Sequence, residues 1–197
     1  MSLLPPLHCI DGLTPEVFPS AALVLGYVDG QWPTYDELRR NYADSSTHVL
    51  SVTVAGKAGA DFADCEKGNI QPPQVAQWAK SELKAGRKPG IYGSKDFLDA
   101  CRVELGKVRV RPSLVNWFLA DYIQVAPQLS EVKWPRSVPS GYVGWQFADS
   151  IPVNGHTIDC SIVNRNFARS RGWGKPKKIK YLPLSEVVAH TVKDTLA

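Results

Sequence analysis

The sequence predicts a single α/β domain, a distorted or incomplete (β/α)8 TIM-like barrel followed by a C-terminal tail. Apolar or β-branched runs of strand length alternate with amphipathic helical segments, and several of these runs end in an acidic residue. The length of 197 residues suits one domain of ordinary size. The alternation favours parallel strands with right-handed crossovers, and so a closed or nearly closed barrel or a doubly wound sheet.

We expect the first half of the domain to begin at residue 21, after an N-terminal extension of residues 1–20. The apolar run from Ala21 ends in Asp29-Gly30, which is typical of a buried strand that carries a carboxylate at its end. Thr34 and Glu37 form a capping-box pattern at the start of a short helix. The expected strands of this half are residues 21–29, 48–55 and 61–66, and the expected helices are residues 34–42 and 72–86.

The second half repeats this pattern up to about Phe167, so the barrel is expected to span residues 21–167. The expected strands are residues 89–93, 114–122, 141–147 and 156–163, and the expected helix is 94–106. Residues 168–197 have the composition of a basic linker, with a short amphipathic helix at 184–196 that docks on this domain or on a partner.

The net charge of +4 is unevenly distributed, because basic residues cluster near the C-terminal end. The cluster comprises Arg165, Arg169, Arg171, Lys175, Lys177, Lys178 and Lys180. It is either a solvated tail or a surface that binds an anionic polymer or a partner such as a virion protein. No further feature indicates nucleic-acid binding.

The ends of the chain and its cysteines bear on where the protein works. The first residues lack a basic region and contain Pro5-Pro6, so we expect no signal peptide, and no window is long and apolar enough for a membrane span. A protein made in the cytoplasm would then leave the cell by lysis or within a virion. The four widely spaced cysteines, Cys9, Cys65, Cys101 and Cys160, are expected to be buried free thiols.

Acidic residues at the ends of several predicted strands are the main functional feature. Catalytic groups of β/α barrels lie at the carboxyl ends of the strands, where Asp29, Asp64 with Glu66, Asp121 and Asp159 are expected to meet. Asp64 and Glu66, two apart on one strand, would share a face with Cα atoms roughly 6 to 7 Å apart. This separation suits glycosidic bond hydrolysis, with Glu66 as proton donor. A polar strand end without catalysis is the alternative.

Aromatic residues near the same strand ends are candidate platforms for sugar rings. These candidates are Tyr27, Tyr92, Trp117, Tyr122, Trp145 and Phe147, with Tyr92 and Trp145 preferred for ligand contact. Packing in the core is the alternative role for each of them.

The chain resembles the family 25 glycoside hydrolases, the lysozyme-like muramidases, and more closely their glycoside-hydrolase-like relatives in actinobacteria and their phages. The resemblance spans roughly residues 23–164. It rests on Gly26-Tyr27-Val28-Asp29-Gly30, Asp64-Cys65-Glu66-Lys67-Gly68, Gly90-Ile91-Tyr92-Gly93-Ser94, Trp117-Phe118-Leu119-Ala120-Asp121-Tyr122, Gly144-Trp145-Gln146-Phe147 and Ile158-Asp159. It implies Glu66 as general acid, Asp64 as its partner, Asp29 and Asp159 in the same groove, and the substrate's own N-acetyl group as nucleophile. Asp121 and Gln146 join the aromatic residues as substrate contacts.

Two functions remain open at this stage. The chain is either an enzyme that cleaves the β-1,4 muramyl bond of cell-wall peptidoglycan, or a catalytically inactive glycan-binding or structural protein of a phage virion. Scattered histidines, and the absence of G-x-S-x-G, HExxH, G-x-G-x-x-G and P-loop sequences, argue against metalloenzymes, nucleophilic hydrolases and nucleotide chemistry. No metal and no cofactor is expected.

Overall fold

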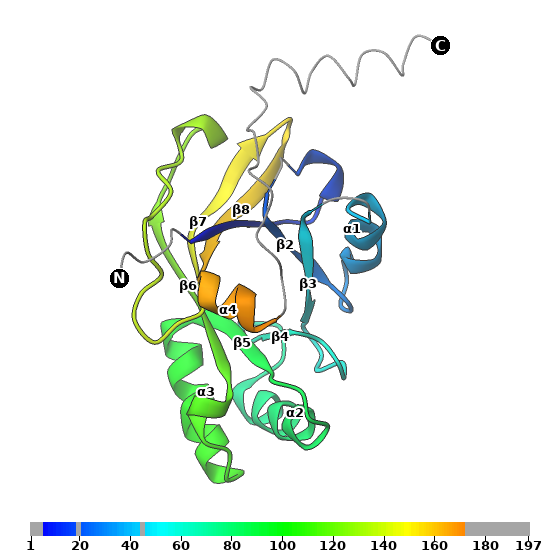
Figure 1. The fold of residues 1–197 in the computed structure, drawn as a ribbon, viewed down its shortest axis with the longest axis vertical. Helices are drawn as coiled ribbons and strands as arrows, with labels where there is room; N and C mark the ends of the chain where they lie inside the picture. The colour runs from blue at the N-terminus through cyan, green and yellow to red at the C-terminus, as the bar shows by residue number, and fades with distance from the viewer. Residues whose placement is uncertain (1–5, 19–20, 44–45, 172–197) are drawn as a thin grey trace.

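The computed structural model describes residues 6–18, 21–43 and 46–171, in which eight strands form a closed barrel in the order β1 to β8 (Figure 1). The strands are β1 (Leu7–Asp11), β2 (Leu23–Tyr27), β3 (His48–Thr53), β4 (Phe62–Asp64), β5 (Gly90–Ser94), β6 (Asn116–Gln124), β7 (Gly144–Val153) and β8 (His156–Val163). The helices are α1 (Tyr35–Asn41), α2 (Pro72–Lys84), α3 (Lys95–Lys107) and α4 (Arg165–Ser170), with 3-10 turns at Pro15–Val17, Pro112–Leu114 and Leu129–Glu131.

The barrel is closed by a strand of opposite direction. Strands β1 to β7 pair in parallel, whereas β8 runs antiparallel to both β7 and β1. The cause is the two-residue turn Asn154-Gly155, whose φ angles of 49° and 81° suit a tight hairpin. The expectation of an entirely parallel sheet was therefore wrong for β8. In the described part of the chain α-helices connect only β2 to β3, β4 to β5 and β5 to β6, so a regular (β/α)8 repeat is not present.

The first strand lies within the segment expected to be an N-terminal extension. Strand β1 pairs with β2 through Cys9 and Ile10, and with β8 along its whole length from Leu7 to Asp11. Leu7 and Cys9 alternate into the barrel interior, while Ile10 packs on the outer side. The barrel thus begins at residue 7 rather than at residue 21.

Large aromatic side chains fill the half of the barrel that contains the amino ends of the parallel strands. Phe62 lies between Phe118 and Phe167, at ring-centroid distances of 5.7 and 5.9 Å. These rings need glycine on the neighbouring strands, since a Cβ at Gly90 would lie 2.2 Å from Phe62 and one at Gly144 would lie 2.3 Å from Phe118. The interior at this level is a packed core rather than a channel.

Helix α4 covers the end of the barrel that contains the amino ends of the parallel strands, and it lies across the centre of the ring in Figure 1. It places Phe167 in the interior cluster, and Arg171 just beyond it forms an ion pair with Asp61, with Nη1 and Oδ1 2.7 Å apart. The predicted boundary at residue 168 was therefore too early, because residues 168–171 belong to the folded domain. The predicted helix at 184–196 and the lysines of the basic cluster lie outside the described residues.

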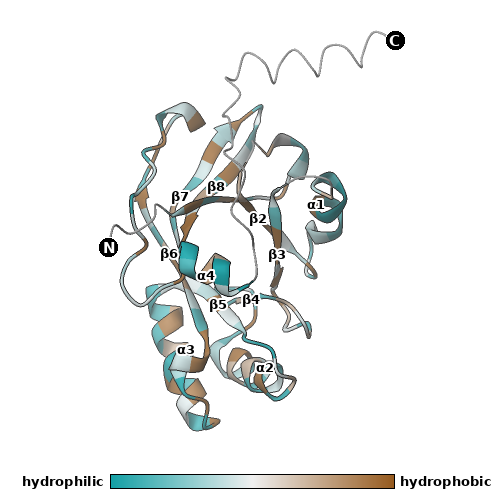
Figure 2. Cartoon of the chain, viewed as in Figure 1, coloured by the Kyte–Doolittle hydropathy of each residue, from teal (hydrophilic) through white to brown (hydrophobic). Residues whose placement is uncertain are grey.

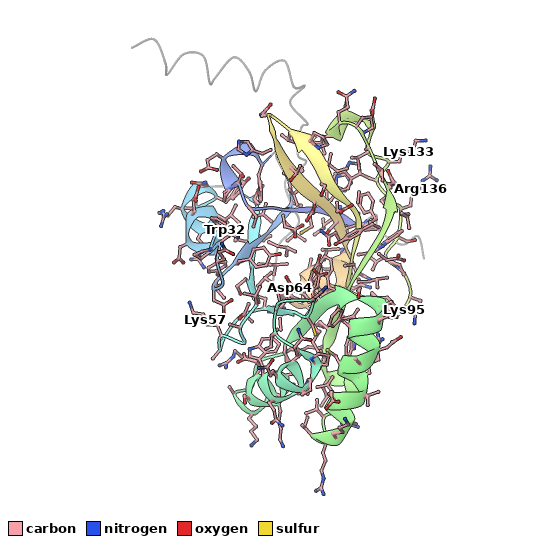
Figure 3. All side chains as sticks on the ribbon, turned by 180° about the vertical axis from the view of Figure 1, so that it is seen from behind. Trp32, Lys57, Asp64, Lys95, Lys133 and Arg136 are labelled. Carbon is pink, nitrogen blue, oxygen red and sulfur yellow. The ribbon has the colours of Figure 1, made fainter. Side chains whose placement is uncertain are left out.

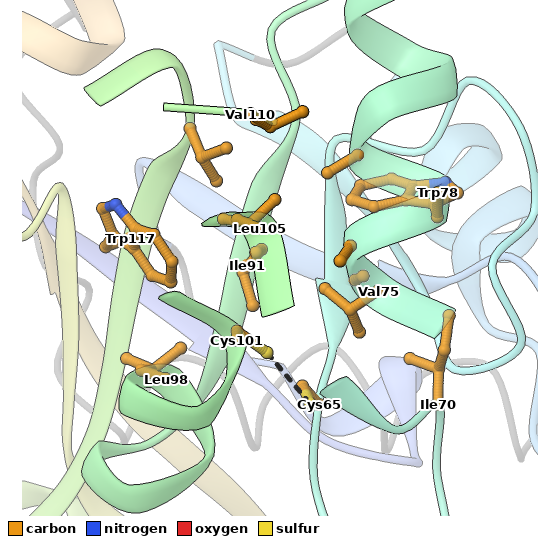
Figure 4. Packing of buried hydrophobic residues seen from close by; sticks show 14 of the residues in the cluster. Cys65, Ile70, Val75, Trp78, Ile91, Leu98, Cys101, Leu105, Val110 and Trp117 are labelled. Atoms are coloured by element: carbon orange, nitrogen blue, oxygen red, sulfur yellow. Dashed lines mark hydrogen bonds between the residues drawn. The ribbon is translucent and has the colours of Figure 1, made fainter. Parts of the chain in front are cut away.

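Helices α2 and α3 form an outer layer against β4, β5 and β6. Hydrophobic residues concentrate on the strands, while α1 is mostly hydrophilic (Figure 2). Val75 and Trp78 of α2 and Leu98 and Leu105 of α3 pack with Ile91 between the helices and the barrel (Figure 4). Burying each of these side chains contributes about 1.5 to 3 kcal/mol. This layer holds β4, and with it the Asp64 segment, in place.

All four cysteines are buried and unpaired, which confirms the expectation of free buried thiols. In the part of the chain that the structure describes, no helix has the length and apolar character needed to span a membrane.

Candidate active site

Four carboxylates, carried by three strands and the residues just after them, gather at the end of the barrel where the parallel strands have their carboxyl ends. Asp11 ends β1, Asp64 ends β4, and Glu66 follows two residues later. Asp159 lies in the first half of β8, and because β8 is antiparallel, this half meets the carboxyl ends of the other strands. Figure 3, the view from behind, labels Asp64 near the centre of the ring of strands. Barrel enzymes carry their catalytic groups at this end.

Asp11 was missed because its strand was assigned to the N-terminal extension. Its side chain is buried, and its backbone pairs directly opposite Asp159. Burial raises the pKa of Asp11 well above its ordinary value, and the charges of Asp159, Asp64 and Glu66 raise this pKa further. The four carboxyl groups thus lie close enough for their charges to affect the pKa of Asp11, and interacting carboxyl groups with raised pKa values are common at catalytic sites.

Asp64 is held by two polar neighbours in a nearly closed environment, with an exposure of 3%. Its Oδ2 accepts a hydrogen bond of 3.0 Å from the side-chain nitrogen Nδ2 of Asn69. Burial and the charge of Glu66 raise the pKa of Asp64 to about 7, against the lowering effects of Asn69 and the Tyr27 hydroxyl. Asp64 can therefore hold or release a proton near neutral pH.

Glu66 lies just beyond the end of β4 and is half-buried, so it is more accessible than Asp64. Burial, and after it the charge of Asp159, raise the pKa of Glu66 above its ordinary value. The backbone before Glu66 is positioned by β5, since the Cys65 amide donates to the Tyr92 carbonyl at 2.8 Å. A Cβ at Gly93 would lie 2.5 Å from the Cys65 carbonyl oxygen, so glycine is required for this close approach.

Asp159 joins this group through β8. Burial raises the pKa of Asp159, and the charge of Asp149 adds to the rise, while the Ser150 amide and Gln146 lower it. Asp159 Oδ1 accepts the Ser150 amide at 2.8 Å. Nearby, Asp11 Oδ1, Asp64 Oδ1 and Ser161 Oγ are buried without a hydrogen-bond partner among the described residues. Such atoms are rare in folded proteins, where a water molecule, an ion, a ligand or a catalytic role accounts for them.

Asp29 has a different environment from these four carboxylates. Its Oδ2 accepts a hydrogen bond from the Thr53 hydroxyl, and its Oδ1 accepts the Val54 amide at 2.8 Å. Both oxygens are thus occupied by the end of β3. This arrangement ties the end of β2 to β3, as a structural carboxylate does, in contrast to the catalytic role implied by the sequence.

Three of the predicted substrate contacts meet inside the barrel, at the same end as the four carboxylates. The hydroxyls of Tyr92 and Tyr122 both donate to Oε1 of Gln146, the second at 3.3 Å. Gln146 is buried, whereas Tyr122 is 48% exposed. The two tyrosines therefore orient the Gln146 amide, and Tyr122 presents an aromatic ring at the entrance. Tyr27, next to Asp64, lies at the same end.

Other predicted substrate contacts lie on the outer side of the barrel. Trp117 packs under α3, where its Nε1 donates to the Pro112 carbonyl at 3.1 Å and the Arg102 guanidinium carbon lies 4.4 Å from its ring centroid. Trp145 packs against Phe147 in the outer layer, with ring centroids 5.9 Å apart, and its Nε1 donates to the Asp121 carbonyl. Asp121 is exposed and alternates outward between two inward residues. The structure thus places Trp117, Asp121, Trp145 and Phe147 on the outer side of the barrel, away from the four carboxylates.

A hollow of about 230 Å³ beside Asp64 contains two residues that the sequence analysis missed. They are Leu13 and Trp32, each 57% exposed. The hollow is lined by Leu13, Tyr27, Asp29, Gly30, Gln31, Trp32, Val54, Asp64 and Asn69. Exposure of a large ring beside a buried carboxylate was not predictable from a strand pattern, because Trp32 belongs to the loop after β2. A larger hollow of about 310 Å³, near Tyr35 and Lys57, contains none of the four carboxylates.

The donor set does not suggest a metal centre. Among residues 6–18, 21–43 and 46–171, no group of three or more His, Cys, Asp or Glu side chains is arranged to hold a metal ion. The site is instead a group of carboxyls with raised pKa values beside tyrosines and an exposed tryptophan, which can donate protons and stabilise positive charge.

Comparison with solved structures identifies the fold. The catalytic domain of endolysin ply40 from bacteriophage P40 of Listeria monocytogenes matches with a TM-score of 0.54 and 10% identity, over 86% of this chain and 98% of that chain. The Clostridium perfringens spore cortex lytic enzyme SleM matches with a TM-score of 0.51 and 11% identity, over 80% of this chain and 67% of that chain. These two likenesses show a shared fold.

A further match is GHIP, a glycosyl hydrolase 25 of Streptococcus pneumoniae, with a TM-score of 0.49 and 15% identity, over 84% of this chain and 92% of that chain. No protein-family model and no curated protein matches the chain. The barrel fold that the sequence resemblance implied is shared with the first two of these structures.

Proposed function

We propose that this protein is a glycosidase that cleaves the β-1,4 muramyl bond of bacterial cell-wall peptidoglycan. The observation that carries the proposal is the group formed by Asp11, Asp64, Glu66 and Asp159 at one end of the barrel, next to a hollow that opens beside Asp64. The fold shared with a phage endolysin domain and a spore cortex lytic enzyme supports it.

Glu66 is the proposed proton donor to the leaving sugar oxygen. It is more accessible than Asp64, and burial together with the charge of Asp159 raises its pKa, so that it holds a proton closer to neutral pH. Asp11 and Asp159 share protons, and the negative charge that this pair retains stabilises an oxocarbenium-like centre.

Asp64 is the proposed partner of Glu66. Its contact with Asn69 fixes the orientation of its carboxyl group, while its Oδ1 is buried and has no hydrogen-bond partner among the described residues. The substrate's own N-acetyl oxygen would then act as nucleophile, with Asp64 orienting that group. Asp29 is assigned to holding β3, since both of its oxygens accept hydrogen bonds there.

Sugar rings are proposed to lie between the hollow and the opposite rim. Leu13 and Trp32 offer exposed apolar surface on one side of the carboxylates, and Tyr122 offers an exposed ring on the other. Indole and phenol rings stack on the apolar faces of sugars while the sugar hydroxyls remain solvated. Exposed contacts on both sides of the acidic group suit an extended glycan rather than a single small sugar.

A phage-encoded lysin or a wall-degrading component of a virion is the proposed biological setting, which the likeness to the bacteriophage endolysin domain supports. Virion proteins remain proposed partners of the basic C-terminal segment. Arg171 is not part of such a free surface, since it pairs with Asp61 on the barrel.

The experiment compares the full chain with Glu66→Gln on purified peptidoglycan. New reducing ends and the masses of the released fragments report which bond is cut. We expect Glu66→Gln to lower the rate about 10²- to 10⁴-fold, the usual contribution of a general acid. Asp121→Asn is the matched control, because Asp121 is exposed and faces outward. Circular dichroism confirms that each variant folds.

Full activity in Glu66→Gln would remove this residue from the mechanism. Release of peptides instead of glycan fragments would contradict the proposed bond. A wild-type chain that pellets with the wall but releases nothing would contradict the enzyme and favour the glycan-binding or structural alternative.

A further inference from the structure

Two thiols lie side by side directly behind the candidate catalytic segment. Cys65 stands between Asp64 and Glu66, and Cys101 lies in the middle of α3, 36 residues further along the chain. Their sulfur atoms are 3.5 Å apart, and both side chains are fully buried (Figure 4). The contact therefore joins the backbone that carries Glu66 to the outer helix layer.

We propose that Cys65 and Cys101 are a reversible dithiol–disulfide pair, which a low-molecular-weight disulfide such as oxidised glutathione converts to a covalent cross-link between the candidate catalytic segment and α3. Each thiol loses its hydrogen, one protein S–S bond forms, and the S–S bond of oxidised glutathione is reduced to two thiols. A disulfide bond is about 2.05 Å long, so the two sulfurs need to approach by about 1.5 Å, which small rotations of the side chains allow.

The remaining cysteines do not offer an alternative pair of the same kind. Cys9 and Cys160 belong to the adjacent strands β1 and β8, but Cys9 pairs with Ser161 and points into the barrel, whereas Cys160 packs in the outer cluster. Thiols on opposite faces of a sheet cannot be bridged without moving the backbone. The geometry therefore selects one pair among the four cysteines.

The same burial makes the pair slow to react in the native state. The hydrogen bond to Cys65 and then burial raise the pKa of the Cys101 thiol, so little of the reactive thiolate is present. Oxidation requires local opening or takes place while the chain folds. The cross-link is thus expected to form readily when the protein refolds in a glutathione buffer.

The disulfide would stabilise the region that connects β4 to α3. It closes a loop that includes α2 and β5, and closing a loop of this length restricts the unfolded chain. We expect the oxidised form to melt roughly 5 to 10 °C above the reduced form. This effect does not depend on the proposed glycosidase activity.

The experiment refolds the full chain from urea in a mixture of oxidised and reduced glutathione and then blocks free thiols. Trypsin releases Cys65 in the peptide 58–67 and Cys101 in the peptide 96–102, because lysine or arginine bounds both segments. We expect these two peptides to be linked and dithiothreitol to separate them. Melting temperatures are measured before and after reduction.

Cys101→Ala and Cys160→Ala are the matched variants, since both remove a fully buried thiol. Cys160→Ala should retain the rise in melting temperature on oxidation, and Cys101→Ala should lose it. If Cys101→Ala does not fold, Cys101→Ser takes its place. Four free thiols after oxidative refolding, a link between other cysteines, or glutathione adducts without the cross-link would overturn the proposal.

Discussion

Asp11 of β1 and Asp159 of β8 stand directly opposite each other across an antiparallel strand pair. Side chains in this relationship have Cβ atoms about 4.5 to 5.5 Å apart, so two ionised carboxylates would repel each other. Burial raises the pKa of each group, and the charge of Asp159 adds to the rise at Asp11. Closure of the barrel therefore favours protonation of this pair. If both carboxyl groups were ionised, their repulsion would lower the stability of the folded state.

Replacing Asp11 by Asn should separate stability from function. The neutral amide removes the repulsion with Asp159, so we expect the free energy of unfolding at pH 7 to rise by a few tenths to about 1 kcal/mol. Wall hydrolysis should fall at least about 100-fold, because the amide can neither take up nor release the proton that Asp11 and Asp159 share. Denaturant unfolding and reducing-end release measure the two effects. Unchanged hydrolysis would exclude Asp11 from the site.

The pH dependence of stability should follow the carboxyl group of Asp64. Its folded pKa of about 7 exceeds the ordinary value of 3.8, so the folded state binds more protons between these pH values. The unfolding free energy therefore falls as pH rises through this window, by up to about 4 kcal/mol for this group. Melting temperatures should be higher at pH 5 than at pH 7.5.

Asp64→Asn is the control for this dependence. The amide does not titrate, so the variant should gain stability at pH 7.5 and show a weaker decrease from pH 5. A wild-type melting temperature that rises over the same interval would contradict the raised pKa.

Asp29→Asn should lower stability and largely preserve hydrolysis, which is the opposite of the result expected for Asp11→Asn. Asp29 accepts hydrogen bonds from Thr53 and Val54, and the substitution weakens both. We expect a loss of about 1 to 2 kcal/mol in stability, with hydrolysis by the folded protein reduced less than tenfold. Urea unfolding and the wall assay test this. A loss of activity equal to that of Glu66→Gln, at unchanged stability, would instead assign a catalytic role to Asp29.

Trp32 and Trp117 form a matched comparison of an exposed and a buried tryptophan, with exposures of 57% and 6%. Trp32→Ala should raise KM for soluble wall glycan about tenfold through lost stacking, with little change in kcat or stability. Trp117→Ala should destabilise the fold by about 3 to 5 kcal/mol and leave KM of the folded protein unchanged. Steady-state kinetics and thermal unfolding measure these effects. A raised KM in Trp117→Ala, or a loss of stability with unchanged KM in Trp32→Ala, would contradict the prediction.

The sequence predicts an element well where its hydrophobic residues repeat clearly with the spacing of a strand or of a helix. The β-branched run at 48–55 and the helical spacing at 72–86 correspond to β3 and α2, with ends that differ by a few residues. The sequence Asp64-Cys65-Glu66 was placed correctly at the end of a strand because the strand, though short, is bounded by a glycine-rich loop. The antiparallel direction of β8 was also accessible, since Asn154-Gly155 is a strong hairpin signal.

By itself, the sequence determined the alternation of strands and helices and the placement of Asp64 and Glu66 at the end of a strand, because these depend on local periodicity. The wide spacing of the cysteines also predicted buried free thiols. Only the tertiary structure decided that Asp11 joins Asp64 and Glu66, since Leu7–Asp11 is too short to be distinguished from an extension until it pairs with β2 and β8. It also decided that Gln146 faces inward while Trp117 and Trp145 face outward. A strand alternates its side chains, and only the closure of the barrel defines which face is the interior.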